Sequence, residues 1–224
     1  MRLLAIETAT DICSVALYNE GQMLAENTLT MPRLHAEALP SLIEHLFLYD
    51  GQTVDSLDVI AVSIGPGSFT GLRIGLSTAK GLMYQHETSL LAIPTLAASA
   101  WSVRRTCDNV GVIHHSYREH FFFAAYQLEP SLETITGPVR IAKSDLITAL
   151  PTELPLVIQA PAETGISVEL NNPVLSTNVV SARAIADLAH HQTENWVVSE
   201  PLLLEPDYLH EYKAVKYQNP LQTG

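Results

Sequence analysis

The sequence contains little cysteine, since Cys13 and Cys107 are the only two among 224 residues. They do not have the Cys-x-x-Cys spacing, and one pair offers no disulfide framework. We therefore predict that both thiols are small side chains, buried or half-buried beside other core residues.

Long hydrophobic runs and basic residues are also scarce. No apolar run approaches the length of a membrane span, and the run that follows Arg2 is broken at Glu7, too early for a secretory signal. Twelve Lys and Arg face 24 Asp and Glu, and the resulting net charge of −12 weighs against independent binding to nucleic-acid phosphates. We expect a soluble cytoplasmic protein with no membrane partner.

Hydrophobic residues, by contrast, make up 47% of the chain, enough to bury a sizeable core in one large domain or two small lobes. In the first half, the apolar pattern predicts strands over 2–8, 12–18 and 23–30, with a hairpin turn at 19–22. A helix over about 35–49, a strand over 57–64, a helix over about 70–86, a strand over 89–93 and a helix over 95–106 are expected next. This order predicts an α/β fold with a mixed sheet.

The second half is less regular. Strands are expected over 110–115 and 121–128, helices over 143–150 and 181–190, and short strands joined by turns in the proline-rich piece 151–173. Apolar periodicity lapses at 101–109. We therefore divide the chain into an N-terminal lobe of residues 1–100 and a smaller C-terminal lobe of residues 101–224.

The most informative segment is a glycine-rich loop, which reads Ile64-Gly65-Pro66-Gly67-Ser68-Phe69-Thr70-Gly71-Leu72-Arg73. Gly65 and Gly67 permit positive φ, and Pro66 fixes the turn between them, so backbone N–H groups can gather at a helix start. That geometry suits an anion or a closely approaching chain. The loop has neither the ending of a phosphate-binding P-loop nor the dinucleotide fingerprint. A tight strand-to-helix turn without a ligand is the alternative.

Ser68 in this loop could be considered as the nucleophile of a serine hydrolase. A hydrolase nucleophile needs a Gly-x-Ser-x-Gly elbow, and no glycine stands two residues after Ser68. We predict instead that Ser68 caps the following helix.

Four segments of the first half form a recognisable set. They are Leu3–Thr10, His35-Ala36-Glu37 with Leu39–Ile43, the glycine-rich loop with Gly75, Ala79, Lys80 and Gly81, and Ile93–Leu96. In order and spacing this set resembles the TsaB (YeaZ) family, the non-catalytic subunit of the bacterial tRNA threonylcarbamoyladenosine machinery. The resemblance covers residues 1–100 almost without gaps and fades after them. It implies two tandem ribonuclease H-like lobes of the actin, sugar kinase and Hsp70 type, with mixed sheets flanked by helices and the second lobe reduced.

In ATP-using relatives of that fold, an acidic residue with hydroxyl neighbours on the first hairpin handles metal and phosphate. Glu7, Thr8 and Thr10, with Ser68 nearby, are candidates for a vestigial phosphate site here, because a carboxylate beside hydroxyls can bind Mg²⁺ through water. The alternative is that the threonines cap the hairpin turn and Glu7 pairs locally. Residues 160–205 hold a single glycine, Gly165, and no Gly-Gly pair to cradle a nucleotide. We expect a degenerate nucleotide fold with no cofactor and no catalytic residue.

A metal site is not expected either. The catalytic relative TsaD carries two metal-binding histidines four residues apart on a helix, whereas this chain has His35 followed by Leu39. The densest histidine cluster is His114, His115 and His120, but adjacent residues of a strand face opposite sides of a sheet. Relatives commonly have an acidic residue where Ser116 stands. Its absence here removes a possible partner of a cation or of a phosphate-bound water, and so argues further against nucleotide binding by this lobe.

Two helices are the candidates for partner binding. Leu39, Leu42, Ile43, Leu46 and Phe47 follow helical spacing and should face the sheet, while Leu48 and Tyr49 fall outside that stripe. Gly71, Gly75 and Ala79 repeat four apart on the next helix and indicate close approach of a backbone, either of the chain's own sheet or of a partner helix. The resemblance implies that these helices pair with TsaD and form homodimers. The expected interface residues are His35, Leu39, Leu48, Tyr49, Gly67, Phe69, Gly71, Leu72, Gly75, Thr78, Ala79 and Leu82.

The resemblance therefore implies a non-enzymatic scaffold that pairs with TsaD and supports threonylcarbamoyl transfer to the anticodon-adjacent adenosine of tRNA. The ATPase TsaE is expected to join this chain through the complex, and tRNA is expected to contact it only indirectly. When the chain is alone, it is expected to pair with a second copy of itself. A free-standing ATP-dependent kinase-like enzyme, or a peptidase acting on a partner, is the first alternative. A homodimeric structural module is the third interpretation.

Overall fold

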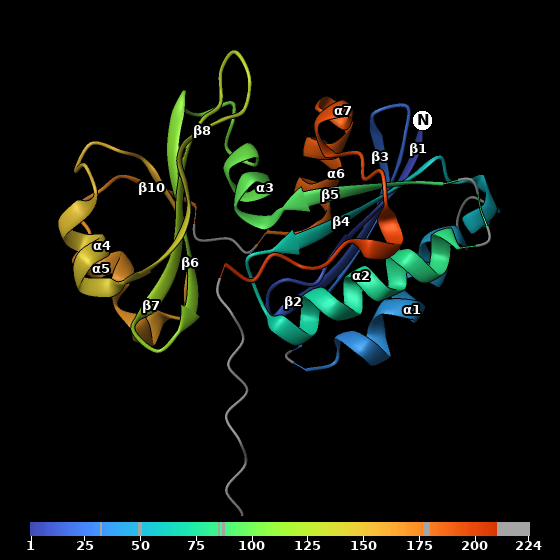
Figure 1. The fold of residues 1–224 in the computed structure, drawn as a ribbon, viewed down its shortest axis with the longest axis horizontal. Coiled ribbons are helices and arrows are strands. Elements are labelled where there is room, and N and C mark those ends of the chain that lie inside the picture. Colours follow the sequence, from blue (N-terminus) through green and yellow to red (C-terminus); the bar gives the residue numbers. More distant parts are fainter. Residues whose placement is uncertain (32, 49–50, 85, 87, 177–179, 210–224) are drawn as a thin grey trace, which may run out of the picture.

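A computed structural model describes residues 1–31, 33–48, 51–84, 86, 88–176 and 180–209. The chain forms two five-stranded sheets that stand side by side in Figure 1. The first sheet is built from β1 (Arg2–Glu7), β2 (Ile12–Asn19), β3 (Gln22–Thr30), β4 (Val59–Gly65) and β5 (Ser89–Pro94). The second is built from β6 (Asn109–Tyr117), β7 (His120–Gln127), β8 (Glu133–Ala142), β9 (Leu156–Gln159) and β10 (Val174–Ser176).

Both sheets have the same topology. The strand orders are β3-β2-β1-β4-β5 and β8-β7-β6-β9-β10, with the first three strands of each antiparallel and the last two parallel to the central strand. This repetition confirms the prediction of tandem ribonuclease H-like lobes with mixed sheets. No repeat is visible in the sequence, because the two sheets share strand order and not residues.

The helices form three layers around the two sheets (Figure 1). One face of the first sheet is covered by α1 (His35–Phe47) and α2 (Phe69–Met83). The layer between the sheets holds α3 (Thr95–Trp101) and α6 (Ala182–His191), and the outer face of the second sheet is covered by α4 (Lys143–Ala149) and α5 (Ile166–Glu169). The remaining short elements are η1 (Val54–Ser56), η2 (Ala162–Thr164), α7 (Thr193–Trp196) and η3 (Pro201–Leu203).

Alternation along β1 divides the core of the first lobe. Leu4 and Ile6 pack under α1 and α2, whereas Leu3 and Ala5 face the layer that contains α6. That middle core also includes Val112 and neighbouring side chains of the second sheet, so one continuous set of buried residues joins both sheets. Helix α6 therefore belongs spatially with the first sheet, although it lies near the end of the sequence.

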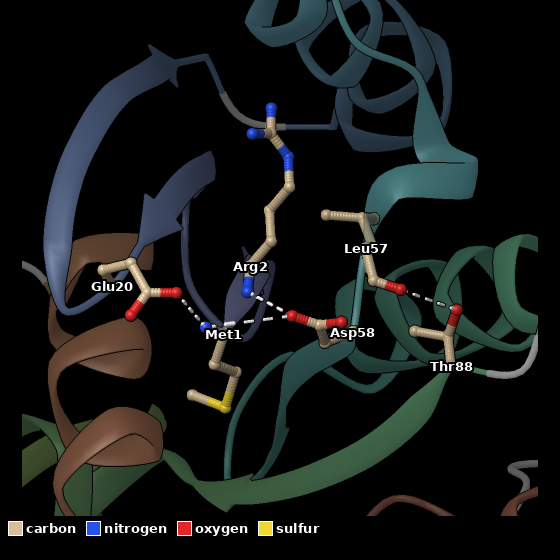
Figure 2. Close-up of polar contacts among 6 residues, drawn as sticks. All are labelled: Met1, Arg2, Glu20, Leu57, Asp58 and Thr88. Atoms are coloured by element: carbon tan, nitrogen blue, oxygen red, sulfur yellow. Dashed lines mark hydrogen bonds and ion pairs between the residues drawn. The ribbon is translucent and has the colours of Figure 1, made fainter.

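The first strand is held at its start by a polar cluster, shown in Figure 2. The amino group of Met1 donates to Glu20 Oε1 at 2.7 Å, and the Arg2 backbone N–H donates to Asp58 Oδ2 at 2.6 Å. These contacts connect β1 to the β2–β3 turn and to the residue before β4.

Among the described residues, no helix combines the length and the apolar character that crossing a membrane requires. The structure also differs from the elements that the sequence predicts. The helix expected over 95–106 ends at Trp101, and β8 was not predicted from the sequence. All residues of β8 from Glu133 to Arg140 are exposed, so no apolar alternation marks this strand.

The glycines of α2 provide a test of its packing. A Cβ placed on Gly71 collides with the backbone oxygen of Thr8, whereas one placed on Gly81 has open space around it. We expect Gly71→Ala to lower the free energy of unfolding by about 1–3 kcal/mol through overpacking. The control Gly81→Ala should raise it by up to about 1 kcal/mol, since alanine favours a helix. Urea unfolding of both variants measures the difference, and equal effects of the two substitutions would contradict the close contact.

Candidate functional site

The glycine-rich loop connects β4 to α2 and is held against the end of β1. Gly65 has φ +119° and precedes a cis Gly65–Pro66 bond, whereas Gly67 does not use the positive φ that a glycine permits. A side chain on Gly67 would instead collide with the carbonyl oxygen of Ala9. The Ser68 backbone N–H donates to that same oxygen at 2.7 Å, so the loop lies directly on the β1–β2 turn.

Ser68 is the N-cap of α2, as the sequence predicts. Its Oγ accepts a hydrogen bond from the Gly71 backbone N–H at 3.2 Å. This contact satisfies one of the free N–H groups of the first turn. The hydroxyl is therefore engaged within the chain.

The stripe of small residues on α2 faces the chain's own sheet. Side-chain atoms added at Gly71 and Gly75 would meet Thr8, and Leu72 and Ala79 are 0% exposed. Leu39 of α1 is 0% exposed as well, and it belongs to the same core. Of the two possibilities that the sequence left open, the close backbone approach is thus to the chain itself.

His35 is buried at the start of α1. Its Nε2 lies 2.9 Å from the carbonyl oxygen of Thr10 and 3.2 Å from that of Ile12. Because both partners are acceptors, Nε2 carries the proton and donates to them. His35 therefore fastens α1 to the β1–β2 turn, and this nitrogen is not available as a metal ligand.

The four candidate phosphate-site residues lie around the same turn. Glu7 Oε1 accepts from the Ala9 backbone N–H at 2.6 Å, and Thr10 Oγ1 accepts from the Ile12 backbone N–H at 3.2 Å. Local contacts of this kind are those expected if the threonines cap the hairpin turn and Glu7 pairs within it. Glu7 Oε2 and Thr8 Oγ1, however, are buried with no hydrogen-bond partner among the described residues. The vestigial phosphate site stays a prediction.

Burial dominates the electrostatics of Glu7, which is 0% exposed. Loss of hydration raises the pKa of its carboxyl group from 4.5 to about 8, and the hydrogen bonds from Ala9 and Ser63 offset only part of this rise. At neutral pH the carboxyl group is mainly protonated and uncharged.

An apolar groove with a volume of about 410 Å³ lies between α1 and α2. We call it the α1–α2 groove. Leu48, Thr78 and Leu82, all expected interface residues, line it, and Tyr49 lies outside the described residues. The other lining residues are Pro40, Ile43, Glu44, Phe47, Gln52, Thr53 and Val54.

Residues 197–209, which we call the C-terminal strap, run back along α2, a feature that the sequence did not reveal (Figure 1). Lys80 Nζ donates to the carbonyl oxygens of Leu202 and Leu204 at 2.9 and 2.7 Å. Arg73 Nε donates to Tyr208 Oη at 2.9 Å, and the Tyr208 ring lies 4.7 Å from that of Phe69. The strap thus supplies the hydrogen-bond partners of Arg73 and Lys80. It also covers part of Phe69, an expected interface residue.

The two histidines of β6 are engaged by neighbours. His114 is buried with its Nε2 2.9 Å from Ser99 Oγ, and burial lowers the pKa of its imidazole to about 3. His115 Nε2 donates to the Arg118 carbonyl oxygen at 2.9 Å. Within the described part of the chain, no group of three His, Cys, Asp or Glu side chains is placed to hold a metal ion.

Comparisons with known proteins agree with this architecture. A family model described as "TsaD: tRNA N6-adenosine threonylcarbamoyltransferase" matches residues 22–214. The TsaB protein of Escherichia coli K12 is 39% identical over 104 residues, which cover 45% of each chain, so the match spans less than half of that relative. TsaB of Bacillus subtilis is 27% identical over 180 residues, or 79% of this chain and 78% of the relative.

Solved structures extend the comparison to almost the whole fold. YeaZ from Pseudomonas aeruginosa has a TM-score of 0.80 at 25% identity and covers 93% of this chain and 99% of its own. The activator of 2-hydroxyisocaproyl-CoA dehydratase from Clostridium difficile, solved with ADPNP, has a TM-score of 0.54 at 10% identity and shares the fold alone.

Two mixed sheets of one topology, each flanked by helices, define a protein of the ribonuclease H-like, actin-type fold. Within that class, the chain belongs to the family of the tRNA N6-adenosine threonylcarbamoyltransferase model, and its resemblance to TsaB and YeaZ is confirmed.

The cap of α2 gives a direct test of the role of Ser68. We expect Ser68→Ala to lower the free energy of unfolding by about 1 kcal/mol, because the Gly71 N–H loses its acceptor. Ser77→Ala, at an exposed position inside the same helix, should not lower it. Thermal melting compares the two variants, and a silent Ser68→Ala would contradict the capping role.

Glu7 should make stability depend on pH. Its pKa is about 8 in the folded chain and about 4.5 in the unfolded chain, so the free energy of unfolding falls as pH rises between these values. Each unit of this difference corresponds to about 1.4 kcal/mol. Glu7→Gln should flatten that decline and be relatively more stable at pH 8 than at pH 5, as measured by urea unfolding. The control is Glu153→Gln, at an exposed turn; parallel pH curves for wild type and Glu7→Gln would exclude a buried neutral carboxyl.

Proposed function

We propose that this chain acts in tRNA threonylcarbamoyladenosine biosynthesis, as a scaffold that pairs with TsaD through the α1–α2 groove. The names of its relatives support the pathway, since the E. coli and B. subtilis proteins are called tRNA threonylcarbamoyladenosine biosynthesis proteins. The groove is the single observation that supports the mode of action. Residues 1–100 would supply the partner-binding lobe and residues 101–224 the smaller lobe, with α6 and the C-terminal strap reaching back to the first sheet.

The groove has the properties of a protein-binding surface. It is lined mainly by aliphatic and aromatic side chains, and Leu48 at its end is 67% exposed. Glu44, Gln52 and Thr53 provide polar groups among this lining. A mainly apolar surface that also carries polar groups is typical of interfaces between proteins.

Several of the expected interface residues are buried within the chain, so fewer residues remain for direct contact with a partner. Leu39, Leu72, Gly71, Gly75 and Ala79 support the groove from inside the chain and have no free surface to offer. Direct contact with the partner is assigned to Leu48, Thr78 and Leu82, which line the groove. The buried residues would act only by fixing the positions of the two helices.

A scaffold role fits the state of the groups that a catalyst would need. His35 donates its Nε2 proton to backbone oxygens, and Ser68 Oγ accepts from the helix that it caps. We therefore assign threonylcarbamoyl transfer to TsaD in the complex. TsaE would join through that complex, and the net charge of −12 favours tRNA contact through other subunits.

The test is a binding titration of this chain with purified TsaD. Leu48→Glu places a charge in the apolar groove, where it would lose hydration on binding, so affinity should fall tenfold or more, which corresponds to about 1.4 kcal/mol. The control is Val168→Glu on α5, where the wild-type side chain is 85% exposed on the second lobe. This control should bind TsaD as the wild type does.

Two further measurements separate the alternatives. Light scattering of the chain alone shows whether the same groove joins two copies, in which case Leu48→Glu should also give monomers. A reconstituted modification assay shows whether TsaD is required. Transfer to tRNA by this chain without TsaD would overturn the scaffold role, as would unchanged TsaD binding by Leu48→Glu.

A further inference from the structure

A second, polar pocket lies at the other end of the first sheet from the glycine-rich loop. Its volume is about 630 Å³, and it is formed by the β2–β3 turn, the turn after α3 and one side of α6. Three arginines converge on it, namely Arg104, Arg105 and Arg183, and we call it the arginine pocket. The whole chain contains only 12 Lys and Arg, so this is a local concentration of positive charge in an acidic protein.

The carboxylates that line the pocket are already engaged. Glu20 points to the amino group of Met1, its 2.7 Å partner, as Figure 2 shows. Asp187 Oδ1 accepts from Tyr18 Oη at 2.7 Å, and its Oδ2 lies 3.9 Å from Arg104 Nη1. Arg104 also stacks on Trp101, with its guanidinium carbon 4.8 Å from the ring centroid.

Unlike Arg104, the other two arginines, Arg105 and Arg183, have no such partners among the described residues. Both are exposed, and neither guanidinium group forms a hydrogen bond or ion pair with any residue that the structure describes. Their side-chain N–H groups are therefore available to a ligand in the pocket. Guanidinium groups bind phosphate oxygens through paired N–H donors, which makes such a pair a suitable anion receptor.

Several backbone carbonyl oxygens near the end of α6 are engaged within the chain. The carbonyl oxygen of Asp187 accepts from His191 Nδ1 at 2.7 Å, that of Leu188 from the Gln192 N–H, and that of Ala189 from Thr193 Oγ1. The last turn therefore presents side chains to the pocket. His190, another lining residue, can supply a further N–H donor, whereas the Nδ1–H of His191 is already engaged.

We infer that the arginine pocket binds a small phosphate-bearing anion, held by Arg105 and Arg183. A long polyanion such as RNA would also meet the surrounding acidic surface, whereas a small anion experiences mainly the local field. The site is distinct from the α1–α2 groove, because α6 covers the opposite face of the first sheet. The inference does not depend on the proposed function.

Calorimetric titration with sodium pyrophosphate and with ADP tests this site, at low ionic strength and without Mg²⁺. We expect saturable binding of one anion per chain, weakened about tenfold by Arg105→Gln or by Arg183→Gln and abolished by the double variant. Arg140→Gln, which removes an exposed arginine on β8, is the matched control and should bind as the wild type does. Glu20→Gln should strengthen binding by roughly two- to fivefold, since it removes a nearby negative charge.

The two probes distinguish the source of the phosphate. Equal affinities identify phosphate oxygens as the whole recognition element, and tighter binding of ADP adds contacts to the nucleoside; either result supports the site. The inference is wrong if neither probe gives a saturable signal. It is equally wrong if binding survives the double variant, since the anion would then lie elsewhere, such as near Glu7. Thermal melts of the variants should match the wild type, because both arginines are exposed.

Discussion

The close contact between α2 and the end of β1 is the constraint on which the first lobe depends. Gly71 and Gly75 let the helix approach Thr8 at a distance that no side chain would allow. The neighbouring Glu7 of β1 is fully buried as well. The close approach also fixes the other side of α2 beside α1, and so shapes the apolar groove that Thr78 and Leu82 line.

Much of this arrangement could be predicted from the sequence, and strong local patterns are the reason. Apolar runs located β1, β2 and β4, and Ser68 before a helical stripe identified the cap of α2. Strand β8 escaped prediction because its exposed residues lack alternation and include Gly137 and Pro138. The expected helix over 95–106 ended early, where the Ser102 hydroxyl bonds to the Ser99 carbonyl oxygen.

The candidate sites were harder to predict because they combine distant segments. Gly71, Gly75 and Ala79 have the same spacing whether they face a sheet or a partner, so only the three-dimensional contacts could assign them to the core. Lys80 meets a strap that begins more than a hundred residues later in the sequence. Arg104 and Arg183 carry no shared motif, and only the fold brings them to one pocket.

The position of α6 affects how the first sheet folds during translation. One face of the first sheet, including Leu3 and Ala5, is covered by Ile185 and Leu188 of this helix. That face stays open to water until α6 has emerged from the exit tunnel, although the strands of the sheet are synthesised well before this helix. The first sheet is therefore translated early and completed late, an interval in which a chaperone would have apolar strands to protect.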